Sequence, residues 1–255
     1  MKPVVVRGLE IGTGLPKICV PITGRTREEV LEQAAAIRKT PADLVEWRVD
    51  YFYNVSSLSL LTVLTFLAEL RRALGDLPLL FTFRTAAEGG EQELSLQAYE
   101  ELYRTVITSG LVDVVDVELR LGDALVSRLL AAAHDRGVPV LLSSHDFEKT
   151  PPNEEIAACL QRMQDLGADL AKVAVMPQSE ADVETLLSAT RAFANTADIP
   201  AVTMSMGLLG QVSRTDGERF GSAMTFGAAG QTSAPGQPDV FDLKKAIDNC
   251  HRLLI

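Results

Sequence analysis

Eight short apolar segments alternate along the chain with eight longer segments, and this alternation restricts the fold more than any other feature. Each apolar segment is rich in Val, Ile, Leu or Phe and is only long enough for a β-strand. We expect strands at 17–23, 44–49, 78–84, 112–119, 139–145, 170–176, 200–206 and 222–228.

The segments between these strands have the spacing of amphipathic helices. Three of them end on glycine, at Gly110, Gly137 and Gly167, a residue that helix C-caps favour. Eight strand–helix units in 255 residues predict an α/β fold of the (β/α)8 TIM barrel type, with a doubly wound open sheet as the structural alternative. We expect helices at 26–39, 57–74, 95–110, 122–137, 152–167, 179–196 and 238–254, whereas the connection at 207–221 has weaker helix signals.

Two further stretches lie outside this pattern. The first 13 residues alternate apolar with polar side chains, and we expect a short N-terminal β-hairpin that closes the bottom of the barrel. The stretch 227–239 is rich in Gly, Ser and Pro and is expected to be a mobile loop after the last strand. No linker or repeat array interrupts the chain, so residues 1–255 are expected to form a single domain.

The charge and the cysteines limit the partners and the compartment. The formal net charge of −10 argues against nucleic acid or an anionic membrane surface as a partner. Cys19, Cys159 and Cys250 are too widely spaced for a zinc site or a disulfide framework. No segment reaches the ~20 apolar residues of a membrane span. We therefore expect a cytoplasmic protein.

Charged residues interrupt three of the expected strands, and strand geometry predicts where they point. Successive side chains of a strand lie on opposite faces. In the segments 44–49 and 170–176, the valine and tryptophan side chains share one face, which should pack on the helices, and the same alternation applies to the segment 112–119. The other face directs Glu46, Arg48, Asp116, Glu118 and Lys172 into the barrel.

Lys172 has two interpretations at this point. Burial disfavours the charged ammonium form, so a lysine inside the barrel can supply a free amine that attacks a ketone and forms an imine. Alternatively, Lys172 is structural and forms an ion pair with Glu46, Asp116 or Glu118. The strand by itself leaves both interpretations open.

Further polar residues follow the ends of the expected strands, where barrel enzymes place their sites. A lone histidine is more often structural than catalytic, and His134 and His251 lie in expected helices. His145 differs, because it ends a buried strand. The other candidates after strand ends are Arg84, Glu88, Arg214, Ser233 and Gln237.

Other kinds of chemistry lack their motifs. The three histidines form no HxxxH or HxH pair, so a metal site is not expected. No GxGxxG follows a strand and no GxxxxGK[ST] loop is present, so no nucleotide cofactor is expected. The GxSxG elbow of serine hydrolases is also absent. Lysine, histidine, carboxylates and arginines remain as the candidate chemistry.

Several motifs spread from the second strand to the last are specific enough to indicate a family. They are EWRVD (46–50), LLFTFR (79–84), EGGE (88–91), SHDFEKTP (144–151), KVAVMP (172–177), TMSMG (203–207), SR (213–214), FGSAMTFG (220–227) and SAPGQ (233–237). In their residues and in their order along the chain, these motifs closely resemble those of the type I 3-dehydroquinate dehydratases. The resemblance implies a lyase of the shikimate pathway that converts 3-dehydroquinate to 3-dehydroshikimate by syn elimination through a lysine imine. It also implies no cofactor and a homodimer.

The resemblance assigns roles to individual residues. Lys172 is the implied imine-forming lysine, His145 the general acid and base, and Glu88 the carboxylate beside it. The family commonly has a substrate-contacting serine at the end of the first strand, where this chain has Pro21, so that contact is not carried over. The implied substrate contacts are Glu46, Arg48, Arg84, Arg214, Ser233 and Gln237.

Two other functions fit parts of the pattern. A class I aldolase-like barrel also forms a lysine imine but cleaves a carbon–carbon bond, and such enzymes often bind phosphate with glycine-rich turns after the last two strands. This chain has Arg214 and SAPGQ there, which suits a carboxylate. The second alternative is a non-catalytic barrel that binds a small acid.

Overall fold

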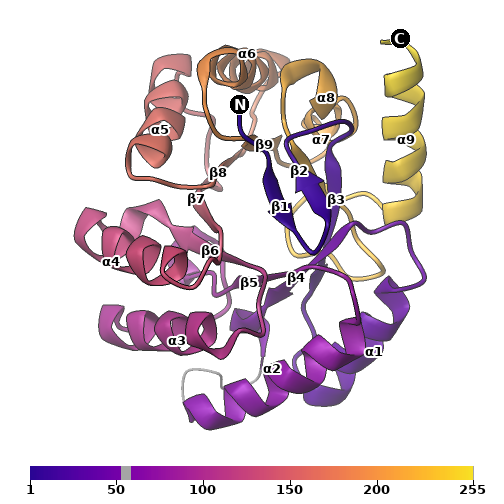
Figure 1. Ribbon diagram of the computed structural model, residues 1–255. Coiled ribbons are helices and arrows are strands. Elements are labelled where there is room, and N and C mark those ends of the chain that lie inside the picture. The colour runs from indigo at the N-terminus through magenta and orange to yellow at the C-terminus, as the bar shows by residue number, and fades with distance from the viewer. Residues whose placement is uncertain (53–58, 255) are drawn as a thin grey trace.

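The computed structural model describes residues 1–52 and 59–254 and shows parallel strands arranged in a ring inside a layer of helices (Figure 1). The strands of the ring are β3 (Lys17–Ile22), β4 (Leu44–Arg48), β5 (Leu79–Thr82), β6 (Val114–Glu118), β7 (Val140–Asp146), β8 (Leu170–Val175), β9 (Ala201–Ser205) and β10 (Met224–Phe226).

These eight strands form one sheet in the order β10-β3-β4-β5-β6-β7-β8-β9, with parallel pairing throughout. The two edge strands meet where the backbone N–H of Ala223, just before β10, donates to the carbonyl of Ala201 in β9 at 2.7 Å. The expected TIM barrel is confirmed, and the open doubly wound sheet is excluded.

Helices follow the strands as expected, and capping side chains explain several of their starts. The side chains of Ser59, Ser95 and Ser179 each accept a backbone N–H from the first turn of the helix that follows. The weak connection at 207–221 holds two short helices, and the first two residues of the expected helix 57–74 lie outside the described residues. No helix in the described part of the chain is long and apolar enough to cross a membrane. The helices are α1 (Arg27–Ile37), α2 (Leu60–Leu74), α3 (Leu96–Ser109), α4 (Asp123–His134), α5 (Asn153–Asp165), α6 (Glu180–Thr196), α7 (Gln211–Thr215), α8 (Gly217–Phe220) and α9 (Val240–Arg252).

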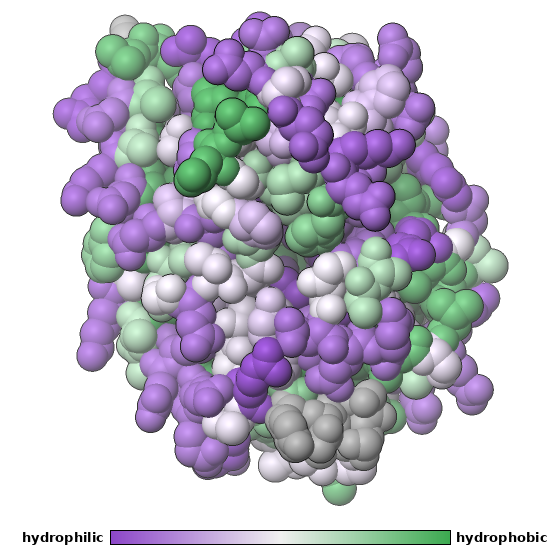
Figure 2. Space-filling model, turned by 180° about the vertical axis from the view of Figure 1, so that it is seen from behind, coloured by the Kyte–Doolittle hydropathy of each residue, from purple (hydrophilic) through white to green (hydrophobic). Residues whose placement is uncertain are grey.

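The N-terminal hairpin is also confirmed. Its strands β1 (Val4–Val6) and β2 (Leu9–Ile11) pair antiparallel and lie in front of the barrel in Figure 1. Val6 and Ile11 belong to the same hydrophobic cluster as Leu44 and Leu141, which are inward residues near the beginnings of β4 and β7. The hairpin therefore fills the amino-terminal end of the barrel, and Figure 2 looks onto the opposite end, where the strands finish.

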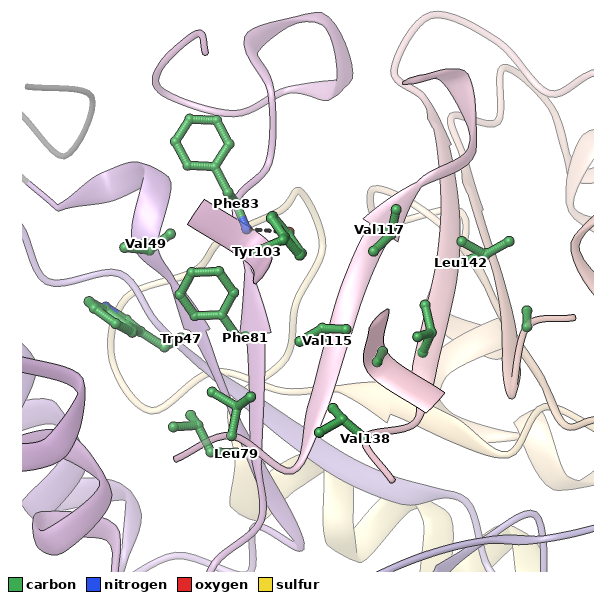
Figure 3. Packing of buried hydrophobic residues seen from close by; sticks show 14 of the residues in the cluster. Trp47, Val49, Leu79, Phe81, Phe83, Tyr103, Val115, Val117, Val138 and Leu142 are labelled. Carbon is green, nitrogen blue, oxygen red and sulfur yellow. Dashed lines mark hydrogen bonds between the residues drawn. The ribbon is translucent and has the colours of Figure 1, made fainter. Parts of the chain in front are cut away.

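The main core lies between the strands and the helices. Figure 3 shows Trp47, Phe81 and Val115 on the helix-facing side of β4, β5 and β6. Tyr103 of α3 reaches between two strand ends, where its hydroxyl accepts the N–H of Phe83 at 3.0 Å and donates to the carbonyl of Asp116 at 2.5 Å.

The strand phase predicted from the sequence is confirmed by this packing. The outward side chains of β4, β6 and β8 belong to the core beneath the helices, so the alternate side chains point inward. The outward residues are Val45, Trp47, Val115, Val117, Val173 and Val175. Those inward side chains are buried charges: Glu46, Arg48, Asp116, Glu118 and Lys172.

Candidate active site

The carboxyl ends of the strands surround one cavity, and all nine residues that the sequence predicted for the site line it. Its apolar wall includes Met204, Met206 and Phe226. The predicted residues reach it from several strand ends: Glu46 and Arg48 from β4, Arg84 and Glu88 after β5, His145 from β7, Lys172 from β8, Arg214 from α7, and Ser233 and Gln237 from the loop after β10.

Lys172 is only 4 % exposed and has a carboxylate and an aromatic ring beside its amine. Its Nζ lies 3.5 Å from Oδ2 of Asp116 and 4.5 Å from the ring centroid of Phe226. Of the three carboxylates that the sequence left open as partners, Asp116 is the one within ion-pair distance in the structure. Oε1 of Glu46 instead accepts the hydroxyl of Thr82 at 2.8 Å.

His145 and Glu88 form a pair in which burial favours the neutral form of both groups. Nδ1 of His145 lies 2.9 Å from Oε2 of Glu88. Burial, followed by the nearby cations Arg84, Lys172 and Arg48, lowers the pKa of His145 well below its ordinary value. Burial raises the pKa of Glu88 to about 8, although the Arg84 cation acts in the opposite direction.

Two glycines fix the position of Glu88. Glu88 ends a short 3-10 turn (Ala86–Glu88), and Gly89 follows with a φ of 81°, a conformation that side-chain-bearing residues rarely adopt. A Cβ on Gly90 would collide with the backbone carbonyl of Arg84. The EGGE motif therefore lets the chain fold back tightly enough to turn the carboxyl group of Glu88 toward β7.

Arg84 lies at the centre of a cluster of carboxylates beneath the cavity. Its Nη2 is 2.6 Å from Oδ2 of Asp116, and its Nη1 is 2.8 Å from the hydroxyl of Ser143. The same Nη1 lies 3.3 Å from Glu118 and 3.5 Å from Glu88. Arg84 therefore lines the cavity, as predicted, but much of its guanidinium is already bound by protein groups.

The remaining polar side chains are held by neighbours that orient them. Asp50 binds Arg48 through two contacts of 2.9 and 2.8 Å. The amide of Gln237 donates to the hydroxyl of Ser233 at 3.0 Å, and its oxygen accepts the N–H of Ser233 at 2.8 Å. The loop 227–239 thus presents both residues to the cavity as one unit.

Arg214 is fully buried, yet no carboxylate among the described residues lies within ion-pair distance of it. Its donors reach the sulfur of Met204 at 3.7 Å and the carbonyls of Phe226 and Pro235 at 3.5 and 3.2 Å. Its Nε is buried and has no hydrogen-bond partner in the described part of the chain. Burial lowers the pKa of Arg214 to about 10, so it remains a cation at neutral pH and offers a site for an anion.

Sequence reasoning missed two residues that the structure brings into contact with the predicted ones: Asp50, which binds Arg48, and Ser143, which binds Arg84. It placed Asp116 inside the barrel as one of three possible partners of Lys172, but it did not distinguish Asp116 from the other two. Ser143 shares a strand face with His145, which is the signal that could have found it. Pro21 pairs in register with Glu46 and is not among the residues that line the cavity. Within the described residues, no group of three or more His, Cys, Asp or Glu side chains is arranged to hold a metal ion.

Comparison with known proteins agrees with this geometry. The family model for type I 3-dehydroquinase matches residues 18–253. The 3-dehydroquinate dehydratase of Listeria welshimeri is 50% identical over 252 residues, which cover 99% of this chain and 99% of that protein. The 3-dehydroquinate dehydratase of Clostridioides difficile is 47% identical and covers 98% of both chains.

Solved structures give the same result. The crystal structure of the type I 3-dehydroquinate dehydratase from Clostridium difficile superposes with a TM-score of 0.95 at 46% identity and covers 99% of both chains. The enzyme from Geobacillus kaustophilus has a TM-score of 0.95 at 36% identity, over 98% of this chain and 97% of that one. The chain belongs to the type I 3-dehydroquinate dehydratases, the lyases that remove water from 3-dehydroquinate in the shikimate pathway.

Proposed function

We propose that Lys172 carries the reaction by forming an imine with the ketone of 3-dehydroquinate, and that His145 moves the protons. The observation that carries this proposal is the convergence of a buried lysine and a buried histidine–carboxylate pair on one cavity. A relative supports it as well: the structure of the Clostridium difficile enzyme contains covalently modified comenic acid.

The lysine step turns a weakly acidic proton into a removable one. The amine of Lys172 attacks the ketone carbon, and loss of water leaves a protonated imine. The α-proton next to the imine is then taken by His145, and the electron pair of the broken C–H bond moves toward the imine nitrogen to give an enamine. The enamine pushes out the β-hydroxyl, which leaves as water with the proton from His145. Hydrolysis of the remaining imine releases 3-dehydroshikimate and restores the amine.

The contact with Glu88 determines which nitrogen of His145 accepts the α-proton of the substrate. When the Nδ1–H donates to an ionised Glu88, Nε2 keeps a free electron pair and can act as the base. The imidazolium that follows is then stabilised by the carboxylate. One histidine serving first as base and then as acid on the same face of the substrate gives syn elimination.

The carboxylate and the hydroxyl groups of the substrate need partners of complementary charge or hydrogen-bonding capacity. We assign the carboxylate to Arg214, because this buried cation has no protein carboxylate beside it among the described residues. We assign the ring hydroxyls to Glu46, Arg48, Ser233 and Gln237, and the remaining free face of Arg84 to the substrate as well. These contacts would hold the ketone against Lys172 and the α-proton against His145.

The test is chemical trapping. Addition of borohydride to the enzyme and 3-dehydroquinate should attach one reduced adduct to Lys172, and Lys172→Ala should abolish turnover measured by the ultraviolet absorbance of the enone product. Lys149→Ala, which removes a lysine outside the cavity, is the matched control and should keep both adduct and activity. An adduct on another residue, or normal turnover by Lys172→Ala, would contradict the proposal.

We further propose that residues 1–255 act as one domain and assemble as a homodimer in the cytoplasm. The three cysteines are free thiols, as a reducing compartment favours. Leu208 and Leu209 are 85% and 51% exposed, and Leu209 and Val212 line a groove with α6. Figure 2 shows apolar side chains gathered on this end of the molecule among hydrophilic ones.

Light scattering on a sizing column should therefore give twice the mass of one chain. Leu208→Asp should shift the protein toward the monomer, whereas Leu61→Asp, at a leucine of α2 that is 74% exposed, should not. A monomeric wild-type protein would contradict the dimer, and equal effects of the two variants would exclude this surface as its interface.

A further inference from the structure

We propose that Asp116 is a positioning residue for Lys172: it holds the amine in place and serves as the counter-ion of the protonated imine. This inference rests on the proposed function, in which Lys172 carries the imine. The geometry points to it because Asp116 lies within ion-pair distance of Nζ, at 3.5 Å, and is fully buried.

The carboxylate of Asp116 is fixed on both of its oxygens. Oδ1 accepts the hydroxyl of Ser143 at 2.6 Å, and Oδ2 accepts Nη2 of Arg84 at 2.6 Å. Ser143 is the residue of β7 that pairs in register with Lys172 of β8. The same strand pairing that places Lys172 therefore also places the hydroxyl that orients its counter-ion, so little motion is needed when the charge on Nζ changes.

The second side of the amine is covered by an aromatic face. Nζ lies 4.5 Å from the ring centroid of Phe226 in β10, the neighbour of β9 at the barrel closure. A ring face attracts a cation but does not accept a proton from it. The nitrogen of Lys172 is thus held between a carboxylate and a π face, two groups that attract a positive charge at this position.

Asp116 remains ionised in this environment. Burial would raise its pKa, but the Arg84 and Lys172 cations and the hydrogen bonds from Ser143 and Arg84 hold the pKa of Asp116 below its ordinary value. A neutral acid could still accept a hydrogen bond, whereas only the anion can balance the positive charge of an iminium ion at this buried position.

Other titratable groups face Lys172 from the surrounding strands, and none of those named here replaces Asp116 as its counter-ion. His145 of β7 and the thiol of Cys19 in β3 both interact with the lysine charge, and both are neutral because of the directions of their pKa shifts. Glu46 of β4 lines the same cavity but accepts a hydrogen bond from Thr82. Arg84 of β5 is itself a cation and contacts Asp116.

Glu118 provides a matched control. It is as buried as Asp116, lies on the same face of β6, and also contacts Arg84, at 3.3 Å. Its oxygens bind the N–H and the hydroxyl of Thr85 at 2.7 and 2.8 Å. Removing the charge of Glu118 therefore removes a buried carboxylate from the same arginine without removing the contact with Nζ of Lys172.

The experiment measures how the protonated imine depends on pH. Wild type, Asp116→Asn, Glu118→Gln and Phe226→Leu are each mixed with 3-dehydroquinate between about pH 6 and 10 and reduced with cyanoborohydride, which reduces the protonated imine. Intact mass spectrometry gives the fraction of adduct on Lys172. The pH at which half of the adduct is lost should fall by about one unit or more in Asp116→Asn, since an opposite charge at this distance shifts such equilibria by that amount. It should fall by roughly half a unit in Phe226→Leu.

The Glu118→Gln control distinguishes the effect of the contact between Asp116 and Lys172 from the effect of removing any buried carboxylate near Arg84. In Glu118→Gln the half-loss pH should stay within about 0.3 units of wild type, while Asp116→Asn should also lose roughly tenfold or more in kcat, the factor that corresponds to one pH unit. Asp116→Ser serves as a second uncharged variant if the asparagine protein does not fold. Equal shifts in Asp116→Asn and Glu118→Gln, or no shift in either Asp116 variant, would overturn the inference. An absent adduct in wild type would instead refute the proposed function itself.

Discussion

Nδ1 of His145 lies 2.9 Å from Oε2 of Glu88, and this contact ties the protonation of the carboxyl group to the tautomer of the imidazole. A protonated Glu88 donates to Nδ1 and leaves the proton of the ring on Nε2, so that the ring cannot accept the substrate's α-proton. An ionised Glu88 accepts the Nδ1–H and leaves Nε2 free. The pair can act as a base only in the second form.

The first prediction concerns the pH dependence of this pair. Because the pKa of Glu88 is raised to about 8, kcat/KM of the wild type should fall as the pH drops below that value. Glu88→Gln cannot titrate and its amide oxygen still accepts the Nδ1–H. The variant should therefore have a lower maximal rate but no acid limb near pH 8 in the pH–rate profile. A limb that persists unchanged in Glu88→Gln would assign it to another group.

The second prediction concerns stability: in the wild type, stability should fall as the pH rises, whereas activity should fall as the pH drops. Glu88 has a raised pKa in the folded protein, about 8 against 4.5 for an unperturbed group. Its burial therefore does not lower the free energy of unfolding below pH 4.5, where the carboxyl group is protonated in both states. The free energy of unfolding falls as the pH rises from 4.5 through 8, because the unfolded protein ionises this group more readily. Urea unfolding should show that Glu88→Gln gains stability relative to wild type between pH 4.5 and 8. A difference that does not change with pH would show that Glu88 is not an acid of raised pKa in the folded state.

Removing the imidazole should separate imine formation from proton transfer. His145→Ala keeps Lys172 and should still be trapped by borohydride with 3-dehydroquinate, while turnover should fall by roughly 10²–10⁴-fold, the usual contribution of a positioned acid–base group. His134→Ala is the control, because His134 lies on the surface of α4 against Asp169 and away from the cavity. Full activity in His145→Ala would remove this residue from the mechanism.

The sequence predicted the barrel and the inward charges for a simple physical reason. Strand alternation has a period of two, so once the valines of β8 were assigned to the helices, Lys172 had to point inward. The ends of parallel strands meet at one end of a barrel, which is why residues as distant in sequence as Glu46 and Gln237 line one cavity. These predictions need only the local pattern and the count of units.

The partners of those charges could not be predicted in the same way. Alternation gives the face of a residue but not the distances across the barrel, so Asp116 could not be distinguished from Glu46 or Glu118 as the neighbour of Lys172. Arg84 was expected to contact substrate, and nothing in its motif indicated that its guanidinium would sit among three protein carboxylates. Such distances depend on strand stagger and side-chain rotamers, which the sequence does not reveal.

Arg214 allows a prediction about substrate binding. A buried guanidinium without a carboxylate partner should bind the substrate's carboxylate strongly, so Arg214→Gln should raise KM by roughly ten- to a hundredfold, the worth of hydrogen bonds to a charged group. The melting temperature without ligand should not fall, because an uncompensated buried charge is itself destabilising. Lys245→Gln, which removes an equal charge from a side chain that is 75% exposed, should change neither quantity. A large loss of ligand-free stability in Arg214→Gln would show a structural role instead.

Two stacked tyrosines give a stability test of the layer behind the site. The rings of Tyr99 and Tyr103 lie 4.3 Å apart in α3, and both are buried. The hydroxyl of Tyr103 bridges the N–H of Phe83 and the carbonyl of Asp116, whereas that of Tyr99 has no hydrogen-bond partner among the described residues. Tyr103→Phe removes both of these hydrogen bonds to buried backbone groups and should lower the free energy of unfolding by about 1–3 kcal/mol. Tyr99→Phe removes only an unpaired hydroxyl and should be neutral or slightly stabilising. Urea unfolding of the two variants checks this difference, and equal losses would mean that ring packing, and not the bridge to Asp116, accounts for the contribution of these tyrosines.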